Sequence, residues 1–80
     1  GDPIFKKIIQ YLRERGVNRE NFREVFSIVR DIRLDFIMST DKSKFKPSNK
    51  SIKALKETGL SSESIEIIVE LIKEIVGLEK

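Results

Sequence analysis

Apolar residues recur every three or four positions through most of the chain, which is the spacing of amphipathic helices. Residues that start and stop helices divide this pattern into four segments. Asp2 and Pro3 are typical of a helix start, and Gly16 and Gly59 of helix ends, because glycine readily adopts the left-handed conformation. The sequence therefore predicts an all-α protein with helices over about residues 3–15, 19–38, 49–58 and 62–76.

The last predicted helix has the widest apolar face. Ser61 is a favourable N-cap, and Leu60 and Ile65 have the spacing of a hydrophobic staple across it. The apolar residues of this helix cover roughly 200° at 100° per residue, more than a surface helix usually shows. We expect the other three helices to cover this face and the chain to be a monomer. The alternative is a homodimer whose interface contains Ile67 and Leu71.

The two halves of the chain share one pattern. Residues 12–30 align with residues 55–73, and the alignment pairs Gly16 with Gly59 and the predicted cap Asn18 with Ser61. Each half is typical of an αα-hairpin. The match is compatible with an internal duplication, and also with two unrelated hairpins that are capped in the usual way.

These patterns predict one helical domain over residues 1–80. It is a compact four-helix bundle of two αα-hairpins, over 3–38 and 49–76, joined by a loop over 39–49. The apolar stripe of the second helix slips where Arg33 falls inside it and Leu34 and Met38 fall outside, which predicts a bend or an early end. We expect Leu34 and Met38 to pack under the following loop, and contact with a partner is the alternative.

Charge is unevenly distributed along the chain, which has 16 basic and 13 acidic residues and a net charge of +3. The last thirty residues hold four lysines and six glutamates, whereas the loop is basic and carries an aromatic residue. Lysines interleaved with an aromatic ring suit a phosphate backbone and one stacked base. The alternative is a solvated connection whose aromatic ring packs on the core. The candidate nucleic-acid-binding residues of this basic loop are Lys42, Lys44, Phe45, Lys46 and Lys50.

Basic residues on the polar face of the first helix could support the loop, and we expect the acidic face of the last helix to point away from the ligand. These supporting residues are Lys6, Lys7 and Arg13. The first hairpin also resembles a helix-turn-helix in its spacing of glycine and apolar residues. The alternative reading helix would present Arg19, Asn21 and Arg23. Leu12 is a departure from that pattern, since a small residue usually lets the two helices cross closely.

The composition offers little for catalysis. The chain has no histidine and no cysteine, its glycines are isolated, and its carboxylates have cap, first-turn or solvent-face positions. We therefore expect no enzyme activity, no metal and no cofactor. No apolar run approaches the roughly 20 residues that span a membrane, and no signal peptide is visible. These features predict an intracellular protein, cytoplasmic or nucleoid-associated, and the abundance of isoleucine, lysine and glutamate favours a thermophile.

The sequence thus predicts a non-enzymatic helical binding module. The preferred hypothesis is association with nucleic acid, DNA before RNA, through the basic loop and a helix face. The alternative hypothesis is a protein–protein interaction or dimerisation module that uses the wide apolar face of the last helix. In that case the partner is another protein, a second copy or the remainder of a parent protein.

Overall fold

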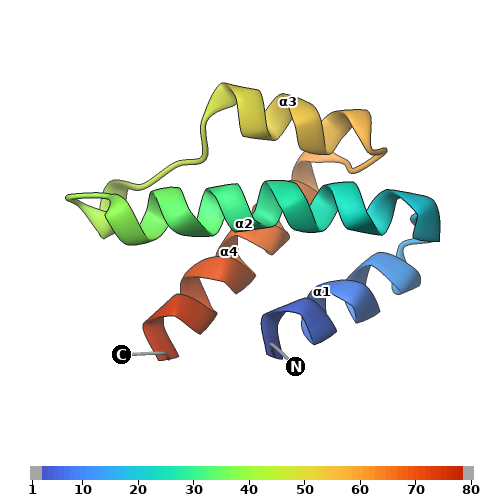
Figure 1. The fold of residues 1–80 in the computed structure, drawn as a ribbon, viewed down its shortest axis with the longest axis horizontal. Coiled ribbons are helices and arrows are strands. Elements are labelled where there is room, and N and C mark those ends of the chain that lie inside the picture. Colours follow the sequence, from blue (N-terminus) through green and yellow to red (C-terminus); the bar gives the residue numbers. More distant parts are fainter. Residues whose placement is uncertain (1–2, 79–80) are drawn as a thin grey trace.

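The computed structural model describes residues 3–78, and within them the chain forms four α-helices and no strand (Figure 1). The α-helices are α1 (Pro3–Glu14), α2 (Phe22–Met38), α3 (Asn49–Glu57) and α4 (Ser62–Leu78). A short 3₁₀ turn, η1 (Arg19–Asn21), precedes α2, and a second one, η2 (Lys42–Lys44), lies in the long connection. The predicted all-α fold is confirmed. Asp2, the predicted cap of α1, lies outside the described residues.

The helices α2 and α4 cross at the centre of the molecule and make its most extensive helix–helix contact (Figure 1). The helix α3 lies mainly against α2, and α1 lies mainly against α4. Each helix of one hairpin therefore packs chiefly on the other hairpin, so neither hairpin buries its apolar face alone. Exchanging the two halves reproduces the same set of neighbours, which is what a duplicated unit packed about a two-fold axis would give.

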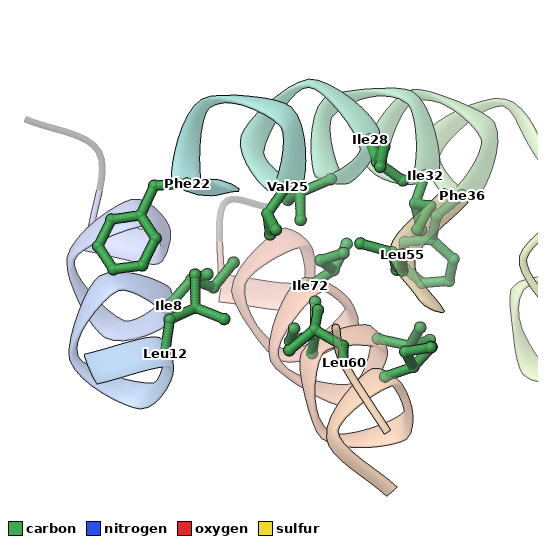
Figure 2. Packing of buried hydrophobic residues seen from close by; sticks show 14 of the residues in the cluster. Ile8, Leu12, Phe22, Val25, Ile28, Ile32, Phe36, Leu55, Leu60 and Ile72 are labelled. Atoms are coloured by element: carbon green, nitrogen blue, oxygen red, sulfur yellow. The ribbon is translucent and has the colours of Figure 1, made fainter. Parts of the chain in front are cut away.

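The core draws on all four helices (Figure 2). The staple residues Leu60 and Ile65 are both buried in it, as their spacing predicts. The side chains with less than 2 % of their surface exposed are Ile8, Leu12, Val25, Val29, Ile32, Leu55, Ile68 and Ile72. The other three helices thus pack on the buried face of α4. The opposite faces of α1, α2 and α4 are directed toward solvent.

The glycine stops are confirmed, because Gly16 and Gly59 have φ angles of +71° and +100°. Ser61 caps α4, since its Oγ accepts a hydrogen bond of 3.1 Å from the backbone N–H of Ser64. Asn18 lies at the N-cap position of η1 and not of an α-helix. Its side chain makes no capping hydrogen bond, and its carbonyl accepts from the N–H of Asn21 at 3.0 Å instead. The second helix of the first hairpin therefore begins with a 3₁₀ turn, and the two halves differ at this point.

The helix α2 runs to Met38, where the predicted helix over 19–38 ends, so the helix does not end early where its apolar stripe slips. Phe36 is buried and continues the apolar stripe beyond Ile32. Leu34 and Met38 do not pack under the loop, because 59 % and 74 % of their surfaces are exposed. The loop instead directs Phe45 onto Phe36, with ring centroids 5.2 Å apart in an edge-to-face arrangement. Phe45, and not Leu34 or Met38, therefore forms the contact between the loop and the end of α2.

Candidate nucleic-acid interface

Lys42, the first lysine of the basic loop, is tied to the C-terminal end of α2. Its Nζ donates hydrogen bonds to the carbonyls of Ile37, at 3.1 Å, and Ser39, at 3.2 Å. The same ammonium lies 5.9 Å from the centre of the Phe36 ring. A cation at the C-terminus of a helix is favoured by the helix dipole and satisfies the last free carbonyls. Lys42 therefore acts as a helix cap and is poorly placed to bind phosphate.

The middle of the basic loop faces carboxylates. Lys44 and Lys46 line a surface hollow of about 520 Å³ together with Glu66, Glu70 and Lys73 of α4. Within this hollow, Lys73 Nζ lies 3.7 Å from Glu70 Oε1. Two glutamates of the acidic face of α4 thus lie beside the lysines of the loop. Phe45 is half-buried and packs on the core, so its ring is not free to stack on a base. Nearby carboxylates lower the attraction of Lys44 and Lys46 for a phosphate.

The remaining predicted lysines lie elsewhere. Lys50, at the start of α3, lines a separate hollow with Asp31 and Asp35 of α2. The helix α1, which carries Lys6 and Lys7, lies apart from the loop at the other end of the molecule (Figure 1). Lys7 Nζ is 3.9 Å from Glu74 Oε1, and both side chains are more than half exposed, which makes the pair weak. The structure does not bring the loop and α1 together into one surface.

The charges of α2 cancel in number but separate in space. At 100° per residue, its arginines fall within one arc of the helix and its carboxylates within another. Three exposed arginines line a hollow of about 680 Å³ that no carboxylate lines. We call these residues the arginine face: Arg19, Arg23 and Arg30. Arg19 and Arg23 belong to the predicted reading helix. Arg30 was not predicted, although at 100° per residue it falls in the same arc of the helix as Arg23.

Ring packing holds the arginine face in place. Phe26 lies in the same hollow and contacts Phe5 of α1, with centroids 5.1 Å apart, and Phe22, at 6.3 Å. These contacts fix α1 beside the flank of α2 that bears the arginines. Within residues 3–78, neither Arg19 nor Arg23 forms an ion pair, and Arg30 forms none either. The three guanidinium groups are therefore presented to solvent from a rigid base.

Asn21, the third residue of the predicted reading helix, has a structural role. Its Nδ2 donates a hydrogen bond of 3.1 Å to the carbonyl of Thr58, and the pair is partly buried. Thr58 is the residue that ends α3, so this bond joins the connection within the first hairpin to the connection within the second. Asn21 is therefore not available to read a base edge. Of the residues predicted for the reading helix, Arg19 and Arg23 are exposed, whereas the amide of Asn21 is engaged in this hydrogen bond.

No family model, curated protein or solved structure matches this chain. Among the described residues, no group of three or more acidic, histidine or cysteine side chains could hold a metal ion. Over the same span, none of the helices combines the length and the hydropathy needed to cross a membrane. The function is therefore inferred from the charged and apolar side chains that α1, α2 and α4 expose.

Proposed function

We propose that this protein is a nucleic-acid-binding module that holds a phosphate backbone on the arginine face. The supporting observation is the hollow in which Arg19, Arg23 and Arg30 gather with no carboxylate. Guanidinium groups bind phosphate through two parallel hydrogen bonds and keep their charge at every physiological pH. Along the helix these arginines span roughly 16 Å, which is long enough to meet several successive phosphates.

The arginine face is a better candidate than the basic loop on electrostatic grounds. Lys44 and Lys46 share their hollow with two glutamates, and Lys42 caps α2. A phosphate that approached this loop would meet carboxylates as well as lysines, since Lys73 in the same hollow is already paired with Glu70. No carboxylate lines the hollow of the arginine face, so the predicted reading helix is a better candidate for the binding site than the loop.

Charge reversal at two sites provides a matched test. Arg23→Glu with Arg30→Glu, and Lys44→Glu with Lys46→Glu, change the net charge equally. Fluorescence anisotropy with a labelled oligonucleotide, from 50 to 200 mM salt, measures the affinity of each variant, and circular dichroism checks its fold. We expect the arginine variant to lose at least tenfold in affinity, with a salt slope shallower by about 1.8 for a duplex. We expect the lysine variant to stay within about threefold of the unmodified protein.

Undiminished binding by the folded arginine variant would refute the proposed site. A large loss in the lysine variant alone would return the site to the loop. Since both variants carry the same net charge, a general electrostatic effect would weaken them equally, and only a local site separates them.

A second candidate function rests on the outer face of α4. Ile67 is 40 % exposed, and Leu71 is half-buried beside it, in a hollow of about 290 Å³ also lined by Glu66, Glu70 and Glu74. An apolar strip bordered by carboxylates suits a basic amphipathic segment of a protein partner. Light scattering over a range of concentrations tests the homodimer. We expect a constant monomer mass, and a dimer that Ile67→Lys dissociates would show that a second copy covers the strip.

A further inference from the structure

We infer that the ligand of the arginine face is a double helix, bound through its phosphates and without regard to base sequence. This inference rests on the proposed function and names the class of nucleic acid. Three features carry it. They are the packing of the aromatic rings, the hydrogen bond of Asn21, and the position of α1 beside α2.

Every aromatic ring of the chain is already packed. The chain has five phenylalanines, one tyrosine and no tryptophan, and all six rings are buried or half-buried. Phe26 packs on Phe5 and on Phe22, and Phe36 packs on Phe45. The guanidinium of Arg15 covers Tyr11, 4.6 Å from the ring centre. Proteins that bind single strands stack the bases on exposed aromatic rings. Phe22 and Phe26 line the hollow of the arginine face, but the first is buried and the second is half-buried against Phe5, so neither ring is exposed as a stacking platform.

Base reading in a groove is also disfavoured. Asn21, whose amide could pair with an adenine edge, is bonded to Thr58. The major groove of B-DNA is about 12 Å wide and admits one helix. The contact between Phe5 and Phe26 places α1 against the flank of α2 that bears the arginines. Two helices packed side by side are roughly 20 Å wide, so α2 cannot enter the groove.

The arrangement of charge favours a duplex over a single strand. Over roughly 16 Å, a duplex presents about nine phosphate charges and a single strand about five. A duplex also holds its phosphates at fixed positions, as α2 holds Arg23 and Arg30 and the 3₁₀ turn before it holds Arg19. A flexible single strand would have to be ordered along the helix, with no stacking to compensate for the lost entropy.

Four probes of about 20 nucleotides test the inference: an A·T-rich DNA duplex, a G·C-rich DNA duplex, an RNA duplex and oligothymidylate. We expect the two DNA duplexes to bind within threefold of each other and at least tenfold more tightly than oligothymidylate at 50 mM salt. The DNA salt slope should be near 2.7 in magnitude for three phosphate contacts. Comparable binding of the RNA duplex would also support a backbone ligand. Asn21→Ala, while folded, should keep the duplex affinity.

The outcomes distinguish a failure of the double-helix inference from a failure of the proposed binding site. Tighter binding of oligothymidylate that is lost in the variant carrying Arg23→Glu and Arg30→Glu would overturn the double helix and leave the arginine face as the site. A tenfold preference for one DNA duplex, lost in Asn21→Ala, would overturn sequence independence. Absence of binding to all four probes at 50 mM salt and high micromolar protein would overturn both the inference and the proposed function.

Discussion

Two neighbouring isoleucines of α4 allow a sharp test of how the core is built. Ile68 has no exposed surface, whereas 40 % of Ile67 is exposed, although the two are adjacent on one helix. Replacing each by alanine removes the same three carbons from the same element. The two substitutions therefore have nearly the same effect on helix propensity and differ in the environment of the deleted atoms.

The expected cost follows from burial. Removing three buried carbons from Ile68 loses about 2.4 kcal/mol of transfer free energy, at about 0.8 kcal/mol for each. The cavity left behind raises the total to between about 2 and 5 kcal/mol. A domain of this size is stable by only about 4–12 kcal/mol, so Ile68→Ala removes a large part of its stability. Ile67→Ala should cost at most about 1.4 kcal/mol, because 40 % of its surface is already exposed and the deletion leaves no enclosed cavity.

Urea denaturation followed by circular dichroism at 222 nm measures both variants. The slope of free energy against urea should stay unchanged, so that the shift in midpoint reports stability alone. If Ile68→Ala leaves too little folded protein, Ile68→Val, with an expected cost of about 0.5–1.5 kcal/mol, gives a measurable baseline. A cost below about 1 kcal/mol for Ile68→Ala, or equal costs for the two alanine variants, would contradict the placement of this helix face in the core.

Other predictions concern single contacts. Asn21→Ala should cost about 1 kcal/mol or more in urea denaturation, because it leaves the Thr58 carbonyl without its donor; an unchanged midpoint would contradict this. Gly59→Ala should cost about 1–2 kcal/mol by the same assay, because a φ of +100° is unfavourable for an L-residue. No atom lies within 4 Å of the added Cβ, so the cost comes from the backbone alone. The hydroxyl of Ser43 donates to Asp41 at 2.6 Å and lowers the pKa of that carboxyl below 3.8. The stabilisation is therefore present above about pH 4 and is lost as the pH falls through the lowered pKa. Carbon NMR titration should show this pKa rising in Ser43→Ala, and an unchanged value would assign the shift to another cause.

The four helices were predictable from the sequence because their determinants are local. A helix start depends on residues within one turn, as at Ser61, and a glycine stop depends on the φ angle of one residue, as at Gly59. Burial of Leu60 and Ile65 follows from the same short-range pattern. Asn18 precedes a 3₁₀ turn and not an α-helix because the choice between the two involves small energies that tertiary contacts can reverse, here the bond from Asn21 to Thr58.

The candidate site depended on tertiary structure. The carboxylates of Glu66 and Glu70 follow Lys44 and Lys46 by some twenty residues in sequence, and only the packing of the loop on α4 brings them to one hollow. The segregation of arginines and carboxylates on α2 was present in the sequence, since it follows from 100° per residue. Whether that arginine flank is exposed was decided by where α1 and α3 pack on α2. A helix fixes the angles between its own side chains, and its neighbours determine which of them meet solvent.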